Sequence, residues 1–260
     1  MKTFAPVALA TLVLAGAAGV AHADLNYNGE VGLPINPTAQ VPEAGGFRLQ
    51  GNYYDLGAKN RLYSLGGAIR ASQTSPIEVN AAVNYADSSG GGSRTRFSIG
   101  AKYLFTRETD PLGVRVAAGV GYGENGYGPG LSLKNTRGYL VATKSFGNVV
   151  PGAGAASITG HLGVRYDRYD LGNSSILLNN KSNRFSVYAG AEVPIVRTGE
   201  FQAIGEIGTK PLRDGLEPYS LGLRYRGTGN PFGATIGIQR LPFSSSGTHF
   251  FAQLGYTFNR

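Results

Sequence analysis

The sequence contains no cysteine and no tryptophan, and its single methionine is the first residue. Without cysteine, the chain cannot form a disulfide bond, a zinc–thiolate site or a thiol nucleophile. After residue 23 the chain also lacks any run of about 18 consecutive apolar residues, the length that a membrane-spanning helix needs. These absences exclude a polytopic helical membrane protein.

Residues 1–23 have the three-part pattern of a secretory signal peptide. Lys2 supplies the positive start, residues 4–20 are mostly apolar, and a small-x-small cleavage site ends at Ala23. A membrane anchor helix is the alternative, but proline and glycine interrupt the apolar stretch. We predict that this signal peptide is cleaved after Ala23, so that the exported protein begins at Asp24.

Glycine and tyrosine are abundant, with 40 and 15 residues in a chain of 260. This composition is unusual for a helical protein and favours one large β domain. The chain is also basic, with a net charge of +8. An exported protein rarely meets nucleic acid, so we expect small anionic solutes or the phosphates of lipopolysaccharide as partners, and no nucleic acid.

Apolar and polar residues alternate in many segments after the N-terminal region. Every second residue from Ile77 to Tyr85 is apolar, and the same holds from Phe97 to Phe105. A transmembrane strand gives this pattern over about ten residues, because only every second side chain meets lipid. We predict twelve such strands, over residues 46–56, 61–71, 76–86, 94–105, 112–122, 138–146, 156–168, 184–194, 201–209, 218–226, 232–241 and 249–258.

An even strand number places both ends of the barrel on the periplasmic side, and the longest connections, 123–137 and 169–183, then fall on the outside. Aromatic residues extend several apolar stripes to the strand ends. Such residues form aromatic girdles at the membrane borders of barrels. The residues that we expect to face lipid there are Tyr85, Tyr103, Phe105 and Tyr256.

The last predicted strand contains Leu254, Gly255, Tyr256 and Phe258, with two further residues after the phenylalanine. These residues resemble the C-terminal assembly signal of bacterial outer-membrane β-barrel proteins, from which the two additional residues depart. The resemblance implies that the barrel-assembly machinery inserts the chain into the bacterial outer membrane, among lipid and lipopolysaccharide. The expected fold is all-β, a transmembrane antiparallel up-and-down β-barrel of about 12 strands formed by residues 46–258.

Residues 24–45 show little alternation and contain Pro34, Pro37 and Pro42. Proline cannot donate a backbone hydrogen bond, so this stretch is not a central strand. Two alternatives remain: an N-terminal leader in the periplasm, which the composition favours, or a partial plug that folds into the lumen.

The parity of the apolar stripes assigns twelve titratable residues to the polar, lumen-lining face. Eight are basic and three are acidic, which predicts an excess of +5, and one is histidine. Basic residues that line a pore favour anions. The assigned residues are Arg48, Arg70, Arg96, Lys102, Arg115, Lys144, Arg165 and Arg224, with Glu78, Glu192, Glu206 and His161.

We therefore predict a narrow passive channel for small hydrophilic solutes with anion preference, without cofactor or metal. A filled structural barrel is one alternative, because networks of Arg and Glu can form a solid polar core. An outer-membrane hydrolase is another, and it needs a nucleophile beside a base. After residue 23 the only histidines are His161 and His249, the second close to Ser244–Ser246. No catalytic motif surrounds them, so we do not expect an enzyme.

Overall fold

The computed structural model describes residues 24–42, 46–70, 75–87, 94–107, 113–126, 132–146, 157–172, 181–196, 198–211, 215–227, 231–242 and 247–258. The predicted signal peptide and its cleavage site lie outside these residues, apart from Asp24 itself, and so does Ser244–Ser246. Among the described residues, no helix is long and apolar enough to cross a membrane.

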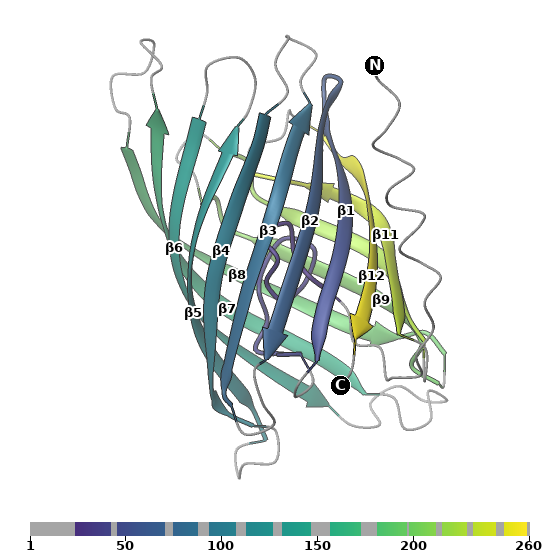
Figure 1. Cartoon of the computed structure of the whole chain (residues 1–260). Helices are drawn as coiled ribbons and strands as arrows, with labels where there is room; N and C mark the ends of the chain where they lie inside the picture. Colours follow the sequence, from purple (N-terminus) through teal and green to yellow (C-terminus); the bar gives the residue numbers. More distant parts are fainter. Residues whose placement is uncertain are drawn as a thin grey trace.

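The strands form one closed antiparallel barrel (Figure 1), in which each strand pairs with its neighbours in sequence and β1 pairs with β12. The prediction of a twelve-stranded up-and-down barrel is confirmed. The strands are β1 (Phe47–Gly57), β2 (Asn60–Arg70), β3 (Ile77–Asp87), β4 (Arg94–Thr106), β5 (Arg115–Gly126), β6 (Ser132–Phe146), β7 (Ile158–Gly172), β8 (Lys181–Pro194), β9 (Phe201–Gly208), β10 (Tyr219–Arg226), β11 (Phe232–Arg240) and β12 (His249–Phe258).

Four strands reach further than the sequence pattern indicates. The β5–β6 ladder continues to the pair Gly126 and Ser132, and the β6–β7 ladder continues from Ser132 to Gly172. Much of the connections expected at 123–137 and 169–183 is therefore strand. Pairing needs only backbone groups, so polar and glycine residues extend a ladder that shows no hydrophobic alternation.

The outward face of the barrel is apolar and uncovered. Phe185, Val120 and Ile207, for example, are more than 60% exposed. The aromatic residues Tyr85, Tyr103 and Phe105 are also exposed. Uncovered apolar side chains around a whole barrel are the property of a surface that faces lipid.

Tyr256 differs from the other three aromatic residues, because it is only 9% exposed. It shares the outward face of β12 with Leu254 and Phe258, so its parity is as expected. Neighbouring rings cover it: the ring centroid of Phe232 lies 5.1 Å away and that of Phe258 lies 4.4 Å away.

Residues 24–42 lie inside the barrel, and we call them the plug segment. Figure 1 shows this dark loop enclosed by the strands. Every residue from Asp24 to Ala39 is buried. Isolated bridges join Leu25 to Val31 and Gly32 to Pro37, so the segment folds on itself and joins no strand of the barrel. Of the two alternatives, a periplasmic leader and a plug in the lumen, the described residues have the plug arrangement.

Among the described residues, three buried apolar clusters occur, and each joins the plug segment to the barrel wall. Tyr27 and Ile35 pack in one cluster, Ala39 packs in the second, and Leu25 and Val31 pack in the third. The apolar core of the molecule is therefore the contact between the plug segment and the wall.

Candidate functional site

The barrel lumen contains most of the titratable residues that the sequence assigns to it. Arg70, Arg96 and Arg115 are partly buried at inward register positions near strand ends. The others, which are almost fully buried on the inward face, are Arg48, Glu78, Lys102, His161, Arg165, Glu192, Glu206 and Arg224.

The assignment of Lys144 to the lumen is wrong. The buried residues that precede Lys144 on β6 include Tyr139, Val141 and Thr143, whereas Lys144 is exposed on the opposite face. Its ammonium group lies 5.8 Å from the centroid of the Phe146 ring, on the outward face. Tyr139 and Val141 face inward because they pack on the plug segment, so apolar residues on this strand do not mark the lipid side.

Sequence parity missed five charged residues of the lumen. Arg137 lies in a stretch expected to be a connection, and Asp24 and Glu30 belong to the plug segment. Asp167 and Arg226 follow Arg165 and Arg224 by two positions, so strand alternation places them on the same face and could have identified them.

Carboxylates of the wall hold the backbone of the plug segment. Glu206 accepts hydrogen bonds from the backbone N–H groups of Ile35 and Asn36, at 2.8 and 3.0 Å. Glu78 accepts one from Val31 N–H at 3.2 Å. A carboxylate that accepts N–H groups forms charge-assisted hydrogen bonds, which are stronger than neutral ones. These residues therefore bind the plug segment rather than line an open pore in this conformation.

Lys102 binds the carbonyl side of the same segment. Its Nζ donates to the carbonyl oxygens of Val31 and Thr38, both at 3.1 Å, and to that of Gln40 at 2.6 Å. The same atom lies 2.9 Å from Glu78 Oε2. All three donors of the ammonium group have partners, so Lys102 is fully used in holding the plug segment.

Two carboxylates of the plug segment pair with arginines of the wall. Glu30 Oε1 lies 3.0 Å from Arg137 Nη2, and Asp24 Oδ1 lies 2.9 Å from Arg224 Nε. Asp24 also pairs with Arg226 through its other oxygen. Buried charges are tolerated when they are paired in this way.

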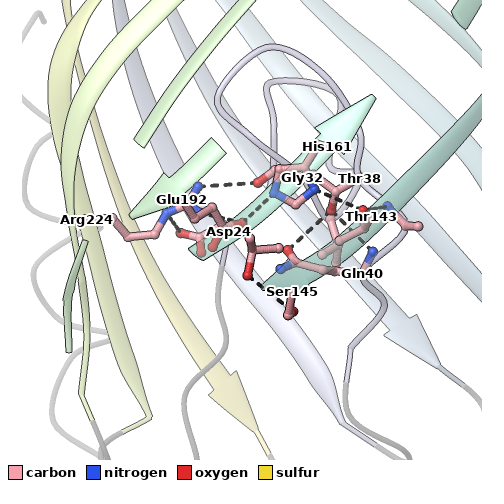
Figure 2. A network of polar contacts seen from close by, with 12 residues as sticks. Asp24, Gly32, Thr38, Gln40, Thr143, Ser145, His161, Glu192 and Arg224 are labelled. Atoms are coloured by element: carbon pink, nitrogen blue, oxygen red, sulfur yellow. Dashed lines mark hydrogen bonds and ion pairs between the residues drawn. The ribbon is translucent and has the colours of Figure 1, made fainter. Parts of the chain in front are cut away.

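The wall also contains a hydroxyl–imidazole–carboxylate chain, which Figure 2 shows beside Asp24 and Arg224. Thr143 Oγ1 lies 2.9 Å from His161 Nδ1, and His161 Nε2 lies 3.2 Å from Glu192 Oε1. A nucleophile, a base and an orienting acid have this order in hydrolases. Here Thr143 Oγ1 accepts a hydrogen bond from Ala39 N–H at 3.0 Å, and all three residues are buried. These three side chains therefore help to position the plug segment through Thr143.

The shape of the wall also fits the plug segment. A Cβ added to Gly190 would lie 2.2 Å from Leu33 Cδ1, and one added to Gly66 would lie 3.0 Å from the Cα of Gly29. Two tyrosine hydroxyls donate to proline carbonyls, Tyr54 to Pro34 and Tyr188 to Pro37. No group of residues suited to a metal ion occurs in the described part of the chain.

These features define the class of the protein: a transmembrane β-barrel of twelve strands, with an apolar outer surface and a polar lumen that its own N-terminal segment fills. No protein-family model matches the chain. No curated protein matches it either.

Among solved structures, the chain is similar to bacterial outer-membrane barrels. The NanC porin is 9% identical, with a TM-score of 0.49, over 82% of this chain and 99% of the porin. The translocator domain of the autotransporter NalP from Neisseria meningitidis is 14% identical, with a TM-score of 0.39, over 83% and 86% of the two chains. At such identities the neighbours indicate no solute, and the properties of this protein follow from its own lumen.

Proposed function

We propose that the protein is a narrow passive channel of the bacterial outer membrane for small hydrophilic solutes with anion preference, closed here by the plug segment. The observation that carries this proposal is the filling of the lumen by residues 24–42. The interior width of a barrel grows with strand number. A barrel of about eight strands is just wide enough for its own side chains to fill the interior. A twelve-stranded wall without the plug segment encloses a wider space.

The contacts that hold the plug segment in the lumen support the proposal that it can be withdrawn. It pairs with no barrel strand, and side chains of the wall bind it, as Glu206 and Lys102 do. Its withdrawal therefore breaks side-chain contacts and leaves every strand pair of the barrel intact. Charged groups on both partners can be rehydrated when water enters the lumen, which lowers the free energy of the open state.

The charges of the lumen support an anion preference. With the plug segment in place, the almost fully buried charged residues among those described are five basic and six acidic. Asp24 and Glu30 leave with the plug segment, and Arg137, Arg224 and Arg226 lose their partners on it. The open wall is then basic, and a basic pore admits anions preferentially.

The proposed surroundings follow from the outer surface. The band of exposed apolar side chains contacts outer-membrane lipid, and basic residues beyond it bind lipopolysaccharide phosphates. We also propose export with a signal peptide cleaved after Ala23 and insertion by the barrel-assembly machinery.

Conductance in planar bilayers tests the proposal. The wild type should conduct rarely, whereas a variant that lacks residues 24–42 and retains the signal peptide should conduct continuously with anion preference. In that variant, Arg115→Glu together with Arg96→Glu should shift the reversal potential toward cations, because both residues lie at inward register positions. A folded deletion variant without conductance would instead establish a filled structural barrel.

The absence of cysteine permits a second test with a matched control. Ala39 of the plug segment and Ala117 of the wall belong to one fully buried cluster, so cysteines at both positions are to be joined as a disulfide by an oxidising reagent that is present while the barrel refolds. Cross-linked protein should lose the remaining conductance, and each single-cysteine variant should be unaffected by the reagent. Equal conductance before and after cross-linking would contradict a moving plug segment.

A further inference from the structure

Arg48 is distinguished from the other almost fully buried basic residues by its surroundings. Lys102 lies 2.9 Å from Glu78, Arg137 lies 3.0 Å from Glu30, and Arg165 lies 2.6 Å from Asp167. Arg224 likewise lies 2.9 Å from Asp24. For Arg48, which is 2% exposed, the described residues provide no carboxylate within ion-pair distance.

The hydrogen-bond donors of Arg48 point to the kind of group that fits there. Its Nε and Nη2 atoms are buried, and no described residue accepts a hydrogen bond from either. These two atoms form the edge of the guanidinium that binds a carboxylate or a phosphate with two parallel hydrogen bonds. Arg226 uses the same two atoms to bind Asp24. The free edge of Arg48 therefore matches an oxyanion.

The carboxylates near Arg48 are engaged with other cations. Asp24 and Glu78 attract Arg48 electrostatically, whereas Arg226 and Arg224 repel it. Asp24 and Glu192 are the carboxylates paired with those two arginines. Glu78 in turn pairs with Lys102. Arg48 is therefore the cation of this group without a carboxylate of its own among the described residues, and a buried charge without a partner is costly.

Thr257 provides a further donor at the same place. It lies directly opposite Arg48 in the pairing of β1 with β12, on the inward face, and its Oγ1 is buried without a partner among the described residues. Cβ atoms of opposite residues in an antiparallel pair lie about 4.5–5.5 Å apart. Figure 1 shows the two strands side by side.

We propose that the Nε–Nη2 edge of Arg48, with the hydroxyl of Thr257, binds a small oxyanion, a carboxylate or a phosphate. Arg48 is the second residue of β1 and Thr257 is the second-last of β12, so the site lies near the end of the barrel where β1 begins. The Arg226 side chain, which lies within the same group of charges, is 13% exposed to solvent. The proposal deepens the proposed anion preference by naming the ligand class and its site.

Calorimetric titration of the purified full chain in detergent, at constant ionic strength, tests this site. The probes are inorganic phosphate, acetate and chloride, and binding by phosphate or acetate with much weaker binding by chloride is expected. Arg48→Lys keeps the charge but loses the planar fork, so oxyanion binding should weaken by about tenfold or more. Arg61→Lys, on the exposed outward face of β2, is the matched control and should bind as the wild type does.

Thr257→Val keeps the side-chain shape without the hydroxyl, and it provides a second test if Arg48→Lys does not form a heat-modifiable barrel. Stronger binding of phosphate than of acetate would identify a phosphate site, and the reverse a carboxylate site. Equal binding of chloride and oxyanions, or unchanged binding in both variants, would overturn the proposal and leave water as the partner of Arg48. Binding is measured on the closed protein without conductance, so this site and the proposed channel can fail separately.

Discussion

The inward and outward faces of the barrel wall come from the same strands and have opposite surroundings. On β3, Glu78 and Asn80 are buried against the lumen, while Val79 and Val83 are about half exposed on the outside. The inward side chains bind a particular segment through hydrogen bonds of fixed direction, as Glu206 does with Ile35. The outward side chains Val79 and Val83 are apolar and make no hydrogen bonds.

This difference determines which substitutions each face tolerates. The outward face needs only apolar character, because lipid tails adapt to the shape of any apolar side chain. The inward face needs a specific partner for each buried charge, since an unpaired one is destabilising. Substitution of an inward residue should therefore lower the stability of the barrel when it removes the partner of a buried charge. Substitution of an outward residue by a charged one should lower the stability by an amount that depends on its depth in the bilayer.

The largest expected effect is the loss of one partner of a buried ion pair. Glu30→Ala leaves Arg137 buried without its carboxylate, which should lower the free energy of unfolding by about 3–5 kcal/mol. Urea unfolding in detergent micelles measures this change. The double variant Glu30→Ala with Arg137→Met should recover much of the loss, and equal stability of the single and double variants would contradict the pairing.

A smaller effect should follow from a charge on the lipid face. Leu140, on β6, is 48% exposed and outward, so Leu140→Arg should destabilise the barrel by about 2–4 kcal/mol if it lies at the bilayer midplane. Thr136→Arg, on the same face of the same strand and four residues closer to its beginning, provides the control. It should cost at most about 1 kcal/mol, because its side chain lies nearer the membrane border. Unfolding of barrels refolded in lipid vesicles measures both, and equal losses would contradict the assigned depth.

The smallest effect is expected at Lys144. In the channel without residues 24–42, Lys144→Glu should leave the reversal potential almost unchanged, because its side chain lies outside the wall. External charges are screened over about 10 Å at 0.1 M salt. Arg137→Glu in the same background should shift the potential toward cations. A similar shift for both variants would place Lys144 in the pore.

The strands were predictable because hydrophobic alternation marks every segment that crosses lipid, as in residues 77–85 and 97–105. For residues 24–45 the sequence left a leader and a plug as alternatives and favoured the leader, because burial of this segment depends on contacts with residues distant in sequence. Ile35 binds Glu206, for example, across 171 positions. The same contacts explain the error at Lys144, since Tyr139 and Val141 are apolar residues that face a polar lumen only where the plug segment covers them.

The position of Leu25 has a consequence for the order of assembly. Gln50 of β1 bonds both the N–H and the carbonyl oxygen of Leu25, at 2.9 and 2.6 Å, and Gln253 of β12 bonds the same carbonyl at 3.2 Å. A ring of strands is completed only where its first and last strands meet, and Leu25 contacts both sides of that junction. The N-terminal segment thus acts as a template against which the two terminal strands find their register. Refolding without residues 24–42 should therefore form the heat-resistant barrel more slowly, which a gel time course would show.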